Sequence, residues 1–391
     1  MEKVRYGIIG LGNQGSSYAL NIFEKGKAVD AVLTAVCDNN PAKIEAFKAK
    51  TENSELVYFA DYKEMLDSGL CDAILVETPH YQHPEIVIEC LNRGINVISE
   101  KPAGVYTKQV REMNEVAKKS NALFALMFNQ RTNCVYRKMK EIIAEGGIGE
   151  LQRVNWIITD WFRTQQYYDS GSWRATWEGE GGGVLINQCP HQIDLVQWVV
   201  GEMPVSVTGF CQYGKWHDIE VEDEVTAFFK YKNGATGVFI TTTGEAPGTN
   251  RLEISGTKGK LLSENGKTLT WVKNAVDSQE HSKTSSESFK KPERIVIDEV
   301  ETDGENPQHA GIINNFTAAL LGKEPLFVDG KDGINGVELM NAIELSGWNN
   351  AEEIILPVDE ERYLSELNAH RAASKIKTGV DAAAANTAGT Y

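Results

Sequence analysis

Residues 4–15 read VRYGIIGLGNQG. A β-rich run is followed by Gly10-Leu11-Gly12-Asn13-Gln14-Gly15, which matches G-x-G-x-x-G and opens a segment that we predict to be helical. In such a turn Gly10 permits the sharp bend, Gly12 lets a pyrophosphate approach the backbone, and Gly15 allows close helix–strand packing. The phosphates then lie against the unpaired N–H groups of a helix N-terminus. The stretch therefore predicts a dinucleotide-binding turn.

A carboxylate suited to the adenosine ribose lies one strand further on. Asp38 ends the β-rich run 31–37, at the spacing from the glycines where such motifs place an acidic residue on the ribose hydroxyls. Its charge repels a 2′-phosphate, and Asn39-Asn40-Pro41 supply no arginine to offset that repulsion. We therefore expect the cofactor to be NAD.

Further cofactor contacts are expected after the β-rich run 73–76. They are Thr78, Pro79, His80 and His83. These residues would lie where the strand order of a doubly wound sheet reverses, close to the nicotinamide ribose. For the two histidines, turn formation and capping of the next helix are at least as good an interpretation.

The first 128 residues alternate β-rich runs with helical segments, such as 83–93 between the runs 73–76 and 96–100. This alternation is typical of a parallel sheet with right-handed crossovers. We therefore predict an α/β domain over residues 1–128, a doubly wound Rossmann sheet that binds NAD.

From Leu151 the pattern changes, because β-rich runs follow one another with a single helical stretch at about 184–200 among them. The runs are 151–162, 204–213, 224–231, 235–243 and 251–255, and helices are expected at 309–321 and 336–349. They predict a second, α+β domain over residues 129–357, built on a large, mostly antiparallel open sheet. We expect this domain to bind substrate, and residues 358–391 to form a C-terminal helix and tail.

Composition narrows the class of protein. The 391 residues carry a formal net charge of −16, which argues against nucleic acid or an anionic membrane as a partner but leaves a small anionic substrate possible. The six cysteines are scattered without a C-x-x-C pair, so we expect neither disulfides nor a metal site. No leader precedes the first strand and no apolar run approaches ~18 residues, so a cytoplasmic location is expected.

Residues 97–102 read VISEKP, an apolar run that ends in Glu100, Lys101 and a proline. The carboxyl ends of strands are where open α/β sheets bind ligands. We therefore place Glu100 and Lys101 beside the cofactor, with the Lys101 ammonium positioned to meet the substrate.

The stretch 181–198, GGGVLINQCPHQIDLVQW, supplies the second group of polar residues. If it is helical from Ile186, then Asn187, His191 and Asp194 share one face at i, i+4 and i+7, with a kink at Pro190. A solvated helix face is the alternative interpretation. Hydride transfer from a secondary alcohol needs a base, for which His191 is suited, and a positive group such as Lys101 near the developing alkoxide. Asn187 or Asp194 would hold the imidazole in one tautomer.

These three segments resemble those of the Gfo/Idh/MocA family, which includes glucose–fructose oxidoreductase and inositol dehydrogenase. The resemblance implies an active site between two domains, a cis bond before Pro102, and dimers or tetramers built through the open face of the second sheet. It also implies catalytic roles for Lys101 and His191. The family's usual aspartate falls on Asn187, which cannot accept a proton.

Aromatic and charged residues that suit a sugar ring are dense between residues 161 and 177. The candidates for substrate binding there are Trp161, Arg163, Tyr168 and Trp173, together with Arg131 after the last Rossmann strand and with His191. Aromatic faces stack on sugar or cyclitol rings, and charged groups pair with hydroxyls. An oligomer interface or a core loop would explain the same composition.

The sequence therefore predicts an NAD-dependent oxidoreductase acting on a secondary hydroxyl of a sugar, glycoside or cyclitol. Three alternatives remain: NAD-assisted glycoside cleavage, a reductase for keto-sugars or nucleotide-linked sugars, and a cofactor-binding regulator without turnover. The presence of both Lys101 and His191 argues against the regulator, which needs neither.

Overall fold

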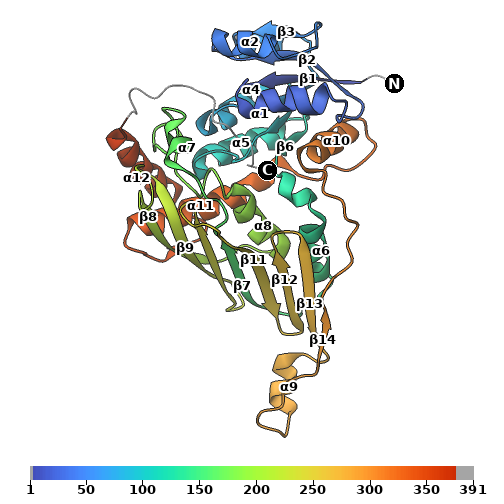
Figure 1. Ribbon diagram of the computed structural model, residues 1–391, viewed down its shortest axis with the longest axis vertical. Helices are drawn as coiled ribbons and strands as arrows, with labels where there is room; N and C mark the ends of the chain where they lie inside the picture. The colour runs from blue at the N-terminus through green and yellow to red at the C-terminus, as the bar shows by residue number, and fades with distance from the viewer. Residues whose placement is uncertain (1–2, 376–391) are drawn as a thin grey trace.

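The computed structural model describes residues 3–375. Its first part is a parallel six-stranded sheet of β1 (Val4–Ile9), β2 (Ala31–Cys37), β3 (Val57–Phe59), β4 (Ala73–Val76), β5 (Asn96–Ser99) and β6 (Phe124–Leu126), in the order β3-β2-β1-β4-β5-β6 (Figure 1). Every residue of β4 is buried, as expected for a central parallel strand covered on both faces. The predicted Rossmann sheet is confirmed.

The helices of this part follow the strands as βαβ crossovers. They are α1 (Asn13–Tyr18) with a π-helical continuation (Ala19–Phe23), α2 (Pro41–Lys48), α3 (Tyr62–Asp67), α4 (His83–Asn92) and α5 (Thr107–Lys119). Side chains close several N-termini: Asn40 accepts the N–H of Ala42, and Asp61 accepts that of Lys63. These caps fix where the chain leaves the carboxyl edge of the sheet, and therefore where the loops of the site begin.

The second sheet has nine strands and is mostly antiparallel, as predicted. They are β7 (Leu151–Ile158), β8 (Ser206–Tyr213), β9 (Glu222–Lys230), β10 (Thr236–Thr242), β11 (Asn250–Gly256), β12 (Gly259–Glu264), β13 (Thr268–Asn274), β14 (Arg294–Ile297) and β15 (Ile354–Ile355). The order is β14-β13-β12-β11-β7-β10-β9-β8-β15, and only the β7–β10 pair is parallel. Sequence patterns missed the last four of these strands in chain order.

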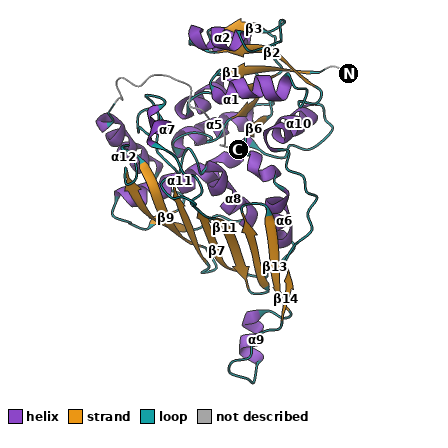
Figure 2. Ribbon diagram, viewed as in Figure 1, coloured by secondary structure: helices purple, strands orange, loops and turns teal. Residues whose placement is uncertain are grey.

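Helices cover one face of this sheet and leave the other open (Figures 1 and 2). The covering helices are α6 (Cys134–Ala144), α8 (Pro190–Val200) and α11 (Gly333–Trp348). Along β8, Gly209 faces α11, because a Cβ there would lie 2.4 Å from the Ile343 carbonyl oxygen, whereas Phe210 points the opposite way and is 58% exposed. The remaining helices are α7 (Gln165–Asp169), α9 (Ser278–Thr284), α10 (Gln308–Leu320) and α12 (Glu360–Ala373).

The helix expected at about 184–200 is shorter than predicted. It begins at Pro190 as α8 and is not kinked there. Proline lacks an N–H, and the first helical position is where that loss costs least, so Pro190 starts the helix instead of interrupting it. Asn187 therefore precedes the helix, and the predicted helical face shared by Asn187, His191 and Asp194 does not exist.

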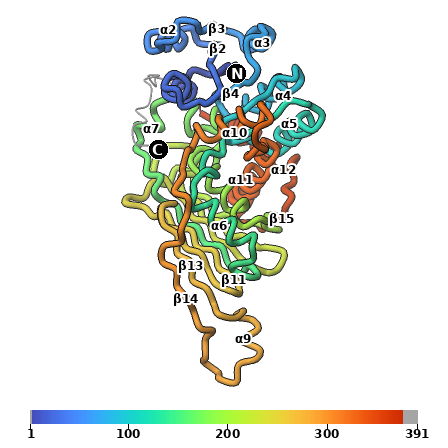
Figure 3. The backbone as a smooth tube through the Cα atoms, turned by 90° about the vertical axis from the view of Figure 1, so that its right-hand side faces the viewer, coloured from blue at the N-terminus to red at the C-terminus, as the bar shows by residue number. Residues whose placement is uncertain are grey.

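The chain returns to the first sheet after completing the second. Helix α10 lies beside α1, and α11 and α12 lie beside α5 (Figures 1 and 3). The Tyr6 hydroxyl is 2.8 Å from that of Thr317, and a Cβ on Gly333 would lie 2.2 Å from Leu126. The C-terminal helix predicted within 358–391 is present as α12, and the tail after residue 375 lies outside the described residues. Within residues 3–375, no helix is both long and apolar enough to cross a membrane.

Candidate active site

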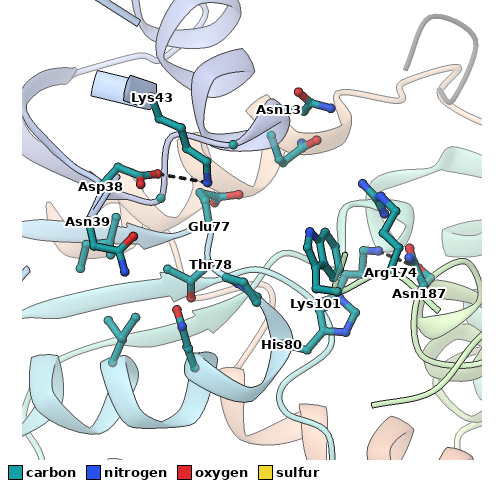
Figure 4. A pocket seen from close by; sticks show the side chains of 18 of the residues that line it. Asn13, Asp38, Asn39, Lys43, Glu77, Thr78, His80, Lys101, Arg174 and Asn187 are labelled. Carbon is teal, nitrogen blue, oxygen red and sulfur yellow. Dashed lines mark hydrogen bonds and ion pairs between the residues drawn. The ribbon is translucent and has the colours of Figure 1, made fainter. Parts of the chain in front are cut away.

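A cavity of about 800 Å³ runs from the carboxyl edge of the first sheet to the loops of the second. Figure 4 shows Asp38 and Lys43 at one end, and Lys101, Asn187 and Arg174 at the other. The first end is built from the turn after β1 and the ends of β2 and β4. The second end adds residues from the segment 161–191. The cavity therefore joins the predicted cofactor turn to the predicted catalytic residues.

The three glycines of the turn have different surroundings. Gly10 has φ +102°, and a Cβ there would lie 2.4 Å from the carbonyl oxygen of Glu77. A Cβ on Gly15 would lie 2.0 Å from the carbonyl oxygen of Gly10, so the helix packs directly on the turn. A Cβ on Gly12 would meet nothing within 4 Å, because Gly12 faces the cavity together with Asn13 and Gln14. This open cradle fits the pyrophosphate of a dinucleotide.

Asp38 lines the cavity and is held by the backbone. Its two oxygens accept the N–H groups of Leu11 at 2.8 Å and Asn40 at 2.9 Å, while the Leu11 side chain itself is buried in the core. The carboxylate keeps free lone pairs for ribose hydroxyls. Lys43, which sequence reasoning did not consider, places its ammonium 3.6 Å from Asp38 and partly offsets its charge (Figure 4).

The loop after β4 supplies Thr78, Pro79 and His80 to the cavity wall. The Thr78 hydroxyl is buried and has no hydrogen-bond partner among the described residues. His83, which we predicted to contact the cofactor, does not line the cavity. Its ring is buried outside the cavity, 2.7 Å from the Thr78 carbonyl oxygen and 2.8 Å from that of Pro102, so it ties two loops together.

Lys101 bridges the two parts of the molecule. Its Nζ donates a hydrogen bond to the backbone carbonyl of Asn187 at 2.9 Å, and the bond to Pro102 is cis, as the resemblance implied. Glu100 does not line the cavity: it accepts the Tyr18 hydroxyl and the Lys101 N–H, and so fixes the lysine backbone. Burial lowers the pKa of Lys101 below that of a free lysine, with Glu100 and Glu180 opposing the shift.

His191 lies in the first turn of α8 and lines the same cavity. Its Nδ1 is buried and has no partner within residues 3–375. Burial, and next the charge of Lys101, lower the pKa of His191 well below its ordinary value. Burial therefore favours the neutral imidazole, which keeps one unprotonated ring nitrogen with a lone pair.

Arg131, predicted to bind substrate, and Asp194, predicted to act in catalysis, do not line the cavity. The two side chains form a bidentate ion pair, with N–O distances of 2.7 and 2.6 Å, and each is only 1% exposed. Arg131 also binds Asp332 at 2.9 Å. A buried guanidinium needs such partners, and Asp194 is therefore not available to orient His191.

The Asn187 side chain is oriented toward Glu180 and away from the imidazole. Its amide donates to the Glu180 carboxylate and, at 3.2 Å, to the Tyr167 hydroxyl. Glu180 is 2% exposed and also accepts the N–H of Ala175. Sequence reasoning missed Glu180, although its place directly before the triple glycine marks a tightly packed position.

Of the four residues between 161 and 177 that we predicted to bind substrate, Trp161, Arg163 and Trp173 line the cavity and Tyr168 does not. The Tyr168 ring is buried and its hydroxyl donates to Thr243. Successive residues of the short helix α7 are rotated by about 100° around its axis, so Tyr167 and Tyr168 point in different directions. Tyr167 faces the cavity instead, together with Arg174.

Glu77 is a further cavity residue that sequence reasoning missed. Both carboxylate oxygens are buried and have no partner among the described residues. Burial, and after it the charge of Glu100, raise the pKa of Glu77 well above its usual value. The signal in the sequence was a carboxylate placed directly after the apolar strand β4, where a Rossmann sheet binds its ligand.

Two family models match the chain. The oxidoreductase family with an NAD-binding Rossmann fold (GFO/IDH/MocA) matches residues 4–128, and the GFO/IDH/MocA C-terminal domain matches residues 136–262.

Individual relatives agree with these matches. Myo-inositol 2-dehydrogenase of Thermotoga maritima is 27% identical over 277 residues, covering 69% of this chain and 78% of the relative. Trans-1,2-dihydrobenzene-1,2-diol dehydrogenase of Xenopus laevis is 30% identical over 233 residues, covering 59% of this chain and 67% of the relative. The crystal structure of the WlbA dehydrogenase from Chromobacterium violaceum, with NADH and UDP-GlcNAcA, is 26% identical, with a TM-score of 0.77 over 92% of this chain and 97% of that one. With its glycine turn, its Lys101 and its two sheets, the chain belongs to the Gfo/Idh/MocA family of NAD-binding oxidoreductases.

Proposed function

We propose that the protein transfers hydride between a secondary hydroxyl of a sugar, glycoside or cyclitol and the nicotinamide of NAD. The observation that carries the proposal is the meeting of Lys101 and His191 in one cavity with the dinucleotide turn. NAD supplies the hydride acceptor when it is bound, and Gly12, Asn13, Gln14, Asp38 and Thr78 would hold it.

The residues at the second end of the cavity suit the remaining chemistry. Neutral His191 accepts the hydroxyl proton as the carbon–hydrogen bond breaks, and the Lys101 ammonium stabilises the charge that develops on oxygen. Trp161 and Trp173 offer aromatic faces to a ring. A myo-inositol dehydrogenase and a dehydrogenase crystallised with a nucleotide-linked sugar acid among the relatives support a polyhydroxylated ring as substrate.

The test is Lys101→Met in an assay of NAD reduction over a panel of inositols, hexoses and methyl glycosides. We expect turnover to fall by ~10²–10³, because the group that stabilises the alkoxide is removed. The dissociation constant of NAD, measured by protein fluorescence, should stay within a few-fold, because Lys101 does not hold the adenosine end.

Lys118→Met is the matched control, since Lys118 is exposed on α5 and pairs only with Glu115 within the described residues. Turnover of Lys101→Met close to that of this control would overturn the catalytic assignment. Reduction of a keto-sugar or release of an aglycone without net NAD reduction would replace dehydrogenation by one of the alternative activities.

A further inference from the structure

We propose, on the basis of the dehydrogenase function above, that the substrate carries a carboxylate, as in a hexuronic acid or its glycoside, and that Arg163 and Arg174 bind it. Both arginines line the cavity at the end that holds Lys101 and Asn187. In Figure 4 the Arg174 side chain lies at this end, far from Asp38 and Lys43.

One aromatic ring holds both guanidinium groups. The centre of the Arg163 guanidinium lies 5.2 Å from the Tyr167 ring centroid, and that of Arg174 lies 4.6 Å from it. Arg163 also lies over the Trp161 ring, 5.7 Å from its centroid, and Arg174 lies over the Trp173 ring, 4.5 Å from its centroid. Stacking on aromatic faces fixes the plane of a guanidinium and leaves its N–H edge for a ligand.

The donors of Arg163 are incompletely used. Its Nη1 donates to the carbonyl oxygens of Trp161 and Phe162, but its Nε is buried with no partner in the described part of the chain. No carboxylate among residues 3–375 lies within 4.0 Å of this side chain, although the charge of Asp160 acts on it from further away. A buried guanidinium donor without an acceptor is costly unless a ligand supplies one.

Arg174 is only partly neutralised. Its Nη1 donates to the Tyr167 hydroxyl at 3.0 Å and lies 4.0 Å from Glu180, whose oxygens already accept hydrogen bonds from Asn187 and Ala175. The charge of Glu180 is also shared with Lys101, so it offsets each cation only in part. In a molecule of net charge −16, this local excess of positive charge selects an anion.

A carboxylate is the anion that this arrangement fits best. Guanidinium groups pair with carboxylates through two parallel N–H···O bonds, which are stronger than hydrogen bonds between neutral groups.

The experiment compares hexuronic acids with their neutral hexoses, in pairs of equal ring stereochemistry, against the protein saturated with NADH. Binding is measured by calorimetry, and turnover is measured separately by NAD reduction. At least one acid should bind tenfold or more tightly than its neutral partner. Arg163→Met and Arg174→Met should each reduce this ratio about tenfold, and Lys substitutions should restore part of it.

Arg153→Met is the matched control, because Arg153 lies on the open face of the second sheet, outside this cavity. Equal affinities within every pair, or an acid preference that both methionine variants retain, would overturn the proposal. Stronger binding of hexose 6-phosphates than of hexuronates would replace the carboxylate by a phosphate. If the protein oxidises neutral sugars alone, the dehydrogenase function stands and the carboxylate proposal is rejected. If it binds the acids selectively but does not reduce NAD, the carboxylate site stands and the dehydrogenase function is rejected.

Discussion

At the scale of single residues, Asn187 shows how a departure from a family pattern is compensated by a neighbour. The resemblance implies an aspartate at this position, yet the Asn187 amide donates to the buried carboxylate of Glu180. An aspartate could not donate there and would place a second negative charge beside the first. Burial already raises the pKa of Glu180, so the site has little capacity for another carboxylate.

We therefore expect Asn187→Asp to lower the thermal midpoint and to reduce turnover at least tenfold, because a buried carboxylate left without its donor costs about 1–3 kcal/mol. The double variant Glu180→Gln, Asn187→Asp should recover much of both losses. In that variant the amide introduced at position 180 donates to the new aspartate, while its oxygen still accepts the Ala175 N–H. Thermal unfolding and NAD reduction are measured for the wild type, the two single variants Glu180→Gln and Asn187→Asp, and the double variant. The departure of the double variant from the sum of the single effects gives the coupling between positions 180 and 187. A double variant no better than Asn187→Asp alone would contradict this account.

At the scale of elements, the glycine segment 181–183 and the strand β9 form one unit. Glu222, at the start of β9, is fully buried and accepts the N–H groups of Gly183 at 2.9 Å and Leu185 at 3.0 Å. A Cβ on Gly183 would lie 2.0 Å from the Glu222 carbonyl oxygen, so only glycine allows this approach. The unit fixes where the chain enters Asn187 and α8, and therefore where His191 lies.

Glu222 should make stability depend on pH. Burial raises the pKa of Glu222 to about 7 from an ordinary value of 4.5. Because the folded pKa is the higher one, the contribution of this group is complete below pH 4.5 and is lost as the pH rises through about 7. Glu222→Gln keeps the acceptor oxygen and cannot ionise. The thermal midpoint of this variant should therefore rise relative to that of the wild type as the pH increases from about 5 to about 8.

Glu224→Gln is the control for this measurement, because Glu224 lies on the same strand but on the open side, bound to Lys215 and Trp216. Parallel pH profiles for wild type and Glu222→Gln would show that the carboxylate does not titrate in this range.

These elements also show what the sequence could and could not predict. The Rossmann strands were predictable because they are mostly apolar and are bounded by glycine and by capping residues. Strands β12 and β13 were missed because one of their faces is open, so lysine and threonine alternate with the few buried residues such as Leu261 and Leu269.

In the site, local motifs placed the glycine turn, Lys101 and His191 in the cavity. The Arg131–Asp194 pair joins residues 63 positions apart, and no local pattern indicates such a partner. The orphaned carboxylate of Glu77 likewise becomes visible only when its surroundings are known.

At the scale of the whole molecule, the open face of the second sheet is the main surface without a covering layer. Phe210 is 58% exposed and Ile157 36% exposed on this face, whereas Gly209, Trp156 and Ile158 beside them are buried. Exposed apolar side chains on an uncovered sheet are typical of an interface between subunits. The resemblance to the family implies the same surface.

We expect a dimer or tetramer in solution, and Phe210→Asp should shift it toward the monomer because it places a charge in the apolar contact. Size-exclusion chromatography with light scattering at ~10 μM gives the mass, in the range where standard interfaces stay assembled. Val29→Asp, at an equally exposed apolar residue ahead of β2, should leave the mass unchanged. A monomeric wild type at this concentration would refute the expectation.

Helix α10 and the loop before α11 pack back onto the first sheet. The part of the chain built on the first sheet and the part built on the second therefore cannot be exchanged as two continuous segments. A fragment ended at residue 128 would leave the Tyr6 hydroxyl without Thr317 and uncover the side of Leu126 against which Gly333 packs. A chimera that exchanges one substrate half for another would therefore have to keep residues 308–333 together with the first sheet. Modular recombination of this architecture needs three junctions in the gene, although the molecule has only two sheets.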